Sequence, residues 1–186
     1  MNTFSKRDAE RLVASLNVGA LNRELIAYWL SLWPGDALPD RASFNPAKLK
    51  HRLPEMILFD VVPGKSVTVR LAGTNIVRGL RMELKGCDWI AAAPPSFRAE
   101  RLRNFTSIAR GAIIVGQRRV PLNFGDSYVC EEILLPFAPG ADGIHSVICH
   151  IDGNPGPHVE INPVSEAMAK PIAMAIFPLP QLKRAA

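Results

Sequence analysis

The stretch VTVRLAGTNIVRGLRMELKGCDWI, from Val67 to Ile90, changes its hydrophobic period partway along. Apolar and polar residues alternate from Val67 to Leu71, which is typical of a β-strand with one buried face. After Gly73 the apolar residues recur at three- and four-residue intervals, and Gly86 is a residue type that often ends helices. A strand that bends at a glycine into short helices brings the chain back over one face of its sheet. The sequence therefore predicts a cup between sheet and helices, where a ligand would bind.

Length and composition indicate one globular domain with flanking segments. The chain has 186 residues, and 48% of them are hydrophobic, which is enough for a core. The net charge of +5 comes from basic residues that are scattered along the chain and interrupted by acidic ones, instead of being concentrated in one strip. Nucleic-acid binding is therefore disfavoured, and a weak nucleic-acid binder is kept only as a third hypothesis.

The sequence shows no sign of export or membrane insertion. The N-terminal residues MNTFSKRDAERL lack the apolar core of a signal peptide, and the longest apolar run is far shorter than a membrane span. The three cysteines, Cys87, Cys130 and Cys149, are far apart and have neither C-x-x-C spacing nor metal-ligand spacing with the four histidines. We expect reduced structural thiols, no metal site and a cytoplasmic protein.

Two N-terminal helices are predicted ahead of the sheet, from Ser5 to about Leu16 and from Leu21 to Trp33. In the second helix, apolar residues recur at helical spacing and form one wide face. Packing into the protein's own core is the favoured interpretation of Tyr28 and Trp29. The alternative is a homodimer, because the apolar faces of these helices exceed what one small sheet covers. Its candidate interface residues are Leu12, Leu16, Leu21, Leu25, Tyr28 and Trp29.

The rest of the chain predicts five strands, one long helix and a proline-rich tail. The helix is expected at Ser96–Arg110, and the tail from Asn154 onward carries a short helix and an apolar stretch that would pack on the domain. Strands are expected at Met56–Val62, from Val67, and at Ala112–Phe124, Tyr128–Ala138 and Ile144–Asp152, the last three forming an antiparallel meander. The predicted divisions are flanking helices at 1–35, the domain at 36–153 and a C-terminal extension at 154–186.

Five local fragments, in the same order, resemble one known family. They are LIAYWLSL, LPDRASFNP, HRLPEMILFDV, VRLAGTNIVRGLRMELKG and EEILLPFAPGADGIHSVI, and the resemblance runs from about Leu25 to Asp152. These fragments resemble the PAS-like single-domain proteins of alphaproteobacteria, the PAS_5 family. The resemblance implies an α+β fold, a five-stranded antiparallel sheet with helices across one face, to which the N-terminal helices are added. It also implies a sensory or regulatory module, without an agreed ligand or catalytic residue.

The resemblance also allows two cofactors to be checked against this chain. Flavin-binding photosensors of the wider family carry an Asn-Cys-Arg motif in a helix, whereas Cys87 is preceded by Gly86 and followed by Asp88. Haem-binding members commonly use a histidine on the long helix, and Ser96–Arg110 contains none, which leaves His150 as the weaker candidate. We therefore predict no cofactor, with flavin and haem both disfavoured.

Candidate cavity residues come from the long helix, the segment before it and the meander. Trp89 and Tyr128 would supply polar groups in an otherwise apolar pocket. Arg70 and Arg119, if they point inward, would favour an anionic ligand. The favoured alternative is that the apolar members simply fill the core. The candidate residues are Trp89, Leu102, Phe105, Tyr128, Cys130, Leu134, Arg70 and Arg119.

Catalysis is not expected from the sequence. Motifs for a nucleophile, a metalloprotease site or a phosphate-binding loop do not appear. Glu131 and Glu132 are adjacent on a predicted strand, so they face opposite ways and would pair with Arg118 or Arg119. We predict a non-catalytic sensory or regulatory module that binds a partner protein and, in the cup, a small ligand. The alternative is a small-molecule enzyme of unknown type that uses the same cup.

Overall fold

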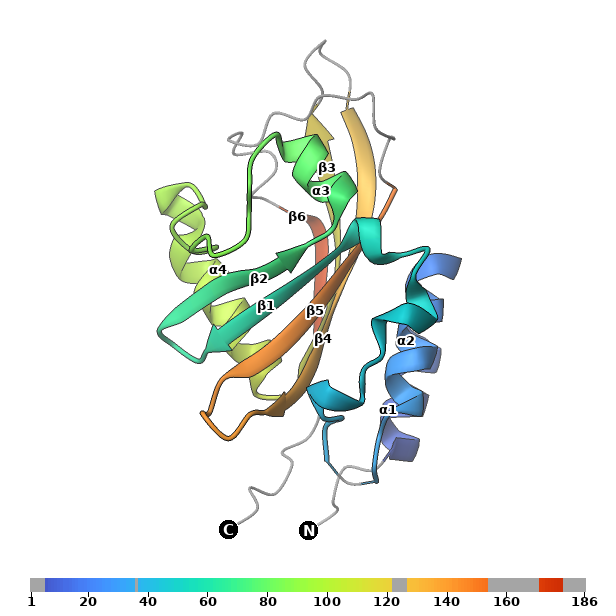
Figure 1. Cartoon of the computed structure of the whole chain (residues 1–186). Helices are drawn as coiled ribbons and strands as arrows, with labels where there is room; N and C mark the ends of the chain where they lie inside the picture. Colours follow the sequence, from blue (N-terminus) through green and yellow to red (C-terminus); the bar gives the residue numbers. More distant parts are fainter. Residues whose placement is uncertain (1–5, 36, 122–126, 154–170, 179–186) are drawn as a thin grey trace.

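Six strands form one antiparallel sheet in the order β2-β1-β5-β4-β3-β6 (Figure 1). The computed structural model describes residues 6–35, 37–121, 127–153 and 171–178. The strands are β1 (Met56–Val62), β2 (Ser66–Ala72), β3 (Ala112–Pro121), β4 (Ser127–Pro139), β5 (His145–Asp152) and β6 (Pro171–Pro178). Five of them match the predicted strands. The predicted α+β fold with an antiparallel sheet is confirmed, and β6 adds one strand to the predicted five.

The additional strand comes from the proline-rich tail. β6 pairs with the outer edge of β3, with Ala112 opposite Pro178 and Ile114 opposite Ile176. The apolar stretch that the sequence predicted to pack on the domain therefore does so through backbone hydrogen bonds. The short helix predicted around Val164–Lys170 lies outside the described residues.

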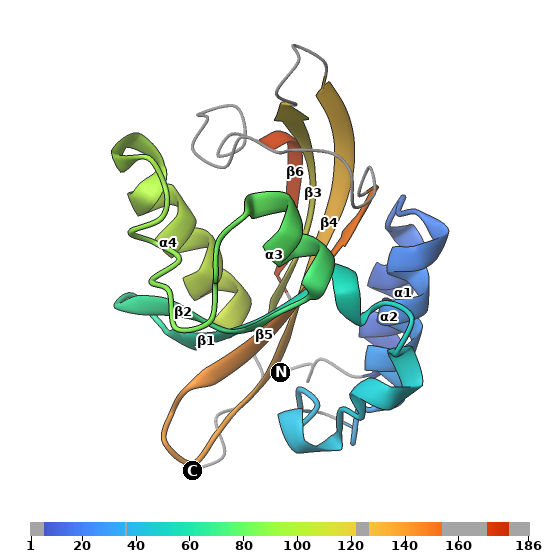
Figure 2. The same cartoon turned by 45° about the horizontal axis from the view of Figure 1, so that its top comes forward.

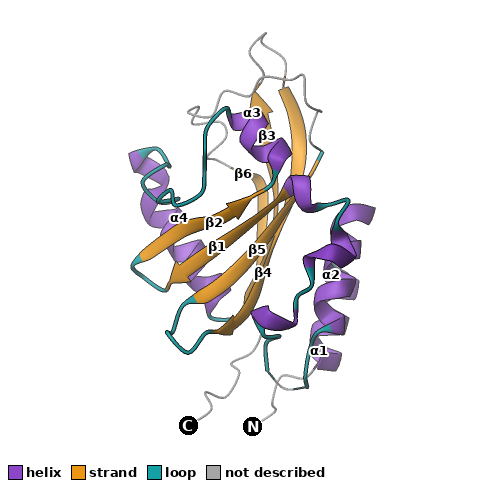
Figure 3. Ribbon diagram, in the orientation of Figure 1, coloured by secondary structure: helices purple, strands orange, loops and turns teal. Residues whose placement is uncertain are grey.

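Helices cover both faces of the sheet, as Figures 2 and 3 show. On one face lie α1 (Lys6–Ser15), α2 (Ala20–Ser31) and three 3-10 turns, η1 (Arg41–Ser43), η2 (Pro46–Leu49) and η3 (Leu53–Glu55). On the other lie α3 (Thr74–Leu80) and α4 (Pro95–Ala109). Successive strand residues point to opposite faces. Neighbours such as Ile57 and Leu58 therefore enter two separate cores.

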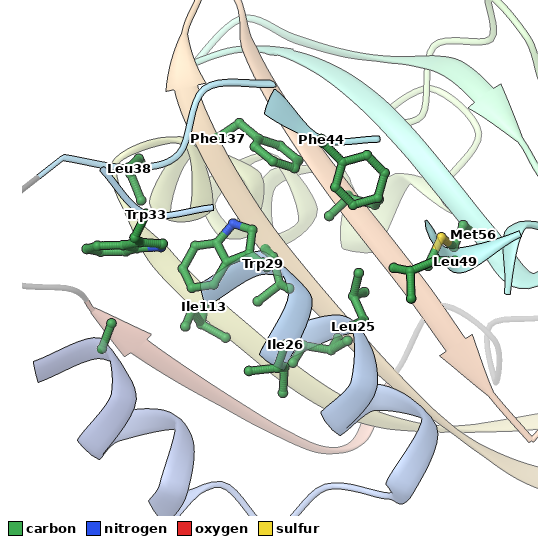
Figure 4. Packing of buried hydrophobic residues seen from close by; sticks show 14 of the residues in the cluster. Leu25, Ile26, Trp29, Trp33, Leu38, Phe44, Leu49, Met56, Ile113 and Phe137 are labelled. Atoms are coloured by element: carbon green, nitrogen blue, oxygen red, sulfur yellow. The ribbon is translucent and has the colours of Figure 1, made fainter. Parts of the chain in front are cut away.

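The core under α1 and α2 is built around Trp29 (Figure 4). Its side chain is fully buried, and its Nε1 donates a hydrogen bond to the Pro136 carbonyl at 2.8 Å. The ring of Trp33 meets that of Trp29 edge-on, with centroids 5.4 Å apart. Leu25, one helical turn earlier, is also fully buried. α2 thus fills the face of the sheet opposite α3 and α4, which agrees with the core-packing interpretation of Trp29.

A buried polar network fixes the start of α2 to the sheet. The Glu131 carboxylate accepts hydrogen bonds from the Gly19 backbone N–H at 2.8 Å and from Asn22 Nδ2 at 2.6 Å. Because the Asn22 amide nitrogen must face that carboxylate, its Oδ1 is the acceptor for His150 Nδ1 at 2.6 Å. Gly19 is the N-cap residue of α2, so Glu131 also satisfies a helix N-terminal donor.

The stretch after β2 bends where the sequence predicts, but its helix is shorter than predicted. A Cβ at Gly73 would lie 2.2 Å from the Leu53 carbonyl oxygen, so glycine is needed there for close backbone approach. α3 ends at Leu80, because Arg81 adopts a left-handed conformation with φ 52°. The following segment then runs along the outer edge of β2, where Gly86 N–H donates to the Val69 carbonyl at 2.7 Å.

Candidate ligand-binding cavity

A cavity of about 310 Å³ lies between the sheet and the elements on its second face. Its walls come from β1, β3, β4, β5 and β6, from α3 and α4, and from the segment between these two helices. Ligand pockets of proteins usually have volumes of about 300–1000 Å³. The predicted cup is therefore present, with room for a small ligand.

Most of the wall is apolar. Three aromatic rings pack together there: Phe59 and Phe105 have centroids 4.9 Å apart, and Phe59 and Trp89 5.6 Å apart. Aliphatic and thioether side chains also line the cavity, namely Ile57, Ile76, Leu80, Met82, Leu84, Ile108, Ile114, Val120, Leu134, Ile151 and Met174. Met82 is 40% exposed and borders the cavity at the surface. Such a wall suits a ligand with a hydrophobic body.

Arg101 supplies a positive charge to this apolar wall. It comes from α4, and its Nη1 donates to the Trp89 carbonyl at 2.9 Å, while its guanidinium carbon lies 5.0 Å from the centroid of the Trp89 ring. The pKa of Arg101 is lowered to about 10, first by burial and then by repulsion from Arg118, against the attraction of Glu132. Arg101 therefore remains a cation at neutral pH.

A buried ion pair between β3 and β4 lies in the same wall. Arg118 Nε and Nη2 are each 2.7 Å from Glu132 Oε1. Burial lowers the pKa of Arg118, but the charge and hydrogen bond of Glu132 outweigh it and raise the pKa above its usual value. Gly116 is directly opposite Glu132, and a Cβ there would come within 2.9 Å of Oε1. The small residue at position 116 thus leaves room for the carboxylate.

The thiols and the phenol of the cavity are held in their neutral forms. Burial raises the pKa of Cys130 to about 11, with a further contribution from Glu132, and raises that of Cys149 well above its usual value. Burial likewise raises the pKa of Tyr128. Because the thiolate is the nucleophilic form of cysteine, both cysteines are weak nucleophiles in this setting. Among the described residues, no group of three or more potential ligand side chains is placed to hold a metal ion.

Five of the eight predicted cavity residues line the cavity. They are Trp89, Phe105, Tyr128, Cys130 and Leu134. Leu102 packs beside the same core without lining the cavity. Whether any of these residues binds a ligand stays a prediction.

The two predicted arginines are placed elsewhere. Arg70 is exposed, and its Nη1 lies 3.1 Å from Asp60 Oδ2. Arg119 is also exposed and donates to Ser127 Oγ at 3.2 Å. Alternation along the strands explains both corrections, because Val69 and Arg118 take the positions that face the cavity side.

The residues that the sequence analysis missed have recognisable signals. Glu132 shares the strand period of Cys130 and Leu134, and Arg101 lies four residues before Phe105 on the same helical face. The predicted partnership of Glu132 with Arg118 is present. Met174 had no local signal, since it reaches the cavity only because β6 joins the sheet.

The candidate dimer residues are mostly used within the chain. Leu16, Leu25 and Trp29 are buried in the core under α1 and α2, so they are not available to a second copy in this arrangement. Leu12 and Tyr28 are partly buried against the same core, and Leu21 is partly exposed. The expectation that the apolar faces of these helices exceed what the sheet covers was wrong, because the helices pack against one whole face of the sheet. The homodimer itself stays a prediction.

His150, the weaker candidate for a haem ligand, does not face the cavity. Its side chain is 1% exposed and hydrogen-bonded to Asn22, whereas the adjacent Cys149 lines the cavity. His150 and the cavity thus lie on opposite faces of the sheet.

Comparison with known proteins gives one family match. The family model PAS_5, described as a PAS domain, matches residues 19–151, from the N-cap of α2 to β5. No curated protein matches the chain. Within the described residues, no helix combines the length and the hydrophobicity that a membrane crossing requires.

Proposed function

The chain belongs to the PAS domain family, a family of sensory and regulatory modules, and we propose that it holds a small, largely apolar molecule in the cavity and signals through a partner protein. The observation that carries this proposal is the cavity between the sheet, α3 and α4. Its wall is hydrophobic and contains few polar groups, which is the usual composition of a small-molecule site.

The cavity lies where occupancy can influence the rest of the domain. Its outer wall is the segment between α3 and α4, and this segment is attached to β2 by three backbone hydrogen bonds, including Trp89 N–H to the Val67 carbonyl at 2.8 Å. Arg98 and Arg101 of α4 also donate to carbonyls of this segment. A ligand that shifts the population of this segment would change the exposed surface beside α4.

A binding role fits the chemistry of the cavity better than the enzyme alternative. General acid–base or nucleophilic catalysis needs a reactive group with a suitable pKa. Here the thiols are kept protonated by burial, and the carboxylate of Glu132 is held by Arg118. We therefore keep catalysis as the less supported alternative.

The partner is the part of the proposal that rests on the family alone. PAS domains commonly act through protein–protein contacts, and we infer the same here. We also infer a cytoplasmic location and kinship with the single-domain alphaproteobacterial proteins that the sequence resembles.

Native mass spectrometry of the purified full chain tests whether the cavity is a binding site. We expect wild-type protein to carry a small molecule that denaturing extraction releases. Cys149→Phe fills the cavity from β5 and should abolish the added mass, whereas Cys149→Ala removes the same thiol but leaves the space open and should retain it. Unliganded wild-type mass, together with no thermal stabilisation by any apolar probe, would contradict the proposal.

A further inference from the structure

Four charged side chains line the cavity, namely Glu100, Arg101, Arg118 and Glu132. The charges of Arg118 and Glu132 shift the pKa of Arg101, whereas Glu100 makes no such contribution. Glu132 forms an ion pair with Arg118, in which both Nε and Nη2 of the arginine are 2.7 Å from one carboxylate oxygen. This ion pair neutralises Arg118, so Arg101 is the cavity arginine whose charge is not paired within the described residues.

Arg101 has no carboxylate partner among the described residues. Its hydrogen bond goes to the neutral carbonyl of Trp89, and its guanidinium lies against the face of the Trp89 ring. A guanidinium has five N–H donors, so several remain for an acceptor inside the cavity. Glu100 also borders the cavity, but it is partly exposed and forms no ion pair within the described part of the chain. Arg101 is partly exposed as well, but Glu100, unlike Glu132, does not contribute to the pKa of Arg101.

We propose that the molecule bound in this cavity is a carboxylate with a hydrophobic body, whose single negative charge is bound by Arg101. This inference rests on the function proposed above and specifies its ligand class. The planar fork of a guanidinium matches a carboxylate, and the hydrogen bonds between them are charge-assisted. The hydrophobic body would lie against the wall around Phe59, Phe105 and Ile108.

Charge also decides which other ligand classes fit less well. A cationic ligand would be repelled by Arg101 in a site of low dielectric constant. A phosphate monoester carries nearly two negative charges at neutral pH and would overcompensate the single unbalanced one. A neutral apolar molecule would fit the wall but leave Arg101 without an anion. Carboxylates are therefore the class that satisfies both the wall and the charge.

Three probes that share one alkyl chain test the inference on the full-length protein: octanoate, octanol and octylamine. Their affinities are measured by isothermal titration calorimetry at constant ionic strength. We expect octanoate to bind at least about tenfold more tightly than octanol, because charge-assisted hydrogen bonds are roughly twice as strong as neutral ones. Octylamine should bind most weakly.

Two arginine variants identify the group responsible. Arg101→Gln should lower the affinity for octanoate to about that for octanol and leave octanol binding unchanged, which also shows that the variant is folded. Arg98→Gln is the matched control, since Arg98 lies on the same helix and donates to the Ala93 and Ala91 carbonyls but does not line the cavity. It should keep the preference for octanoate.

The outcomes separate this inference from the function on which it rests. Equal binding of octanol and octanoate to the wild-type chain, or an octanoate preference that survives Arg101→Gln, would overturn the carboxylate inference and leave cavity binding intact. Failure of all three probes to bind the wild-type protein would count against both proposals.

Discussion

At the scale of single residues, His150 shows how a polar side chain is accommodated inside this domain. It is 1% exposed, and its Nδ1 donates to Asn22, whose amide nitrogen donates in turn to Glu131. The pKa of His150 is lowered to about 4, chiefly by burial, with Arg52 lowering it further while Asp152 and Glu24 raise it. The imidazole is therefore neutral in the folded protein over the physiological range.

This leads to a prediction about stability and pH. An unfolded histidine has a pKa of about 6.5, so between about pH 6.5 and pH 4 the unfolded chain binds a proton that the folded chain excludes. The contribution of neutral His150 to the free energy of unfolding is fully present above about pH 6.5. It falls as the pH decreases from about 6.5 to about 4, by up to roughly 3 kcal/mol. Urea denaturation of the wild type and of His150→Gln across this range measures the difference. Two curves that stay parallel over the window would show that His150 is not the residue responsible.

At the scale of elements, β6 protects an edge of the sheet that would otherwise be exposed. β3 begins with four apolar residues, Ala112 to Val115, and β6 pairs with it through the whole of that stretch. Unpaired apolar edge strands are templates for association with other chains. The tail is therefore a structural part of the sheet, although its six prolines in the sequence indicate an extension.

Ending the chain after Gly153 tests the role of β6. We expect the free energy of unfolding to fall by a few kcal/mol, since each lost hydrogen bond of the ladder contributes about 0.5–1.5 kcal/mol. We also expect self-association through β3, which light scattering detects. A chain that ends after Pro178 is the matched control, because it keeps the strand pairs between β3 and β6. If the shorter chain has the same association state and the same stability as the control, β6 is not needed to protect the edge.

At the scale of the whole molecule, the sheet is a shared wall between two different interiors. The face under α1 and α2 is packed around Trp29, whereas the face under α3 and α4 encloses the cavity. Adjacent residues of one strand serve the two faces, as Ile148 and Cys149 of β5 show. A rigid packed face behind the cavity gives the binding side a fixed wall.

Removal of residues 1–33 should therefore unfold the protein and not merely dissociate a dimer. The deletion removes Leu25, Ile26, Trp29 and Trp33 from one core. Loss of a single buried side chain of these sizes typically costs about 2–5 kcal/mol, and whole domains are stable by only about 5–15 kcal/mol. Circular dichroism during thermal denaturation should show no cooperative transition.

Light scattering of the intact chain at high micromolar concentration tests the predicted homodimer separately. A dimer would have to use surfaces other than Leu16, Leu25 and Trp29.

For the deletion of residues 1–33, a truncated chain that still unfolds cooperatively would contradict the assignment of α2 to the core.

The sequence by itself determined five of the six strands and the apolar faces of α2 and α4. Alternation at Val67–Leu71 and the helical period of α2 and α4 are local properties, because each follows from the geometry of one element. The same alternation predicted the opposite orientations of Glu131 and Glu132, and these now serve α2 and Arg118 respectively. Local fragments also predicted the PAS family, which the match over residues 19–151 confirms.

Only the tertiary structure decided the position of β6, the volume of the cavity and the charge inside it. Pairing of Pro171–Pro178 with β3 joins segments far apart in the chain, and hydrophobicity alone does not specify a partner strand. The space that remains between the sheet and α4 depends on how all side chains pack together. The sequence left Arg118 and Arg119 as alternative partners of Glu132, and the register of β3 and β4 selected Arg118, so Arg101 has no ion-pair partner within the described residues.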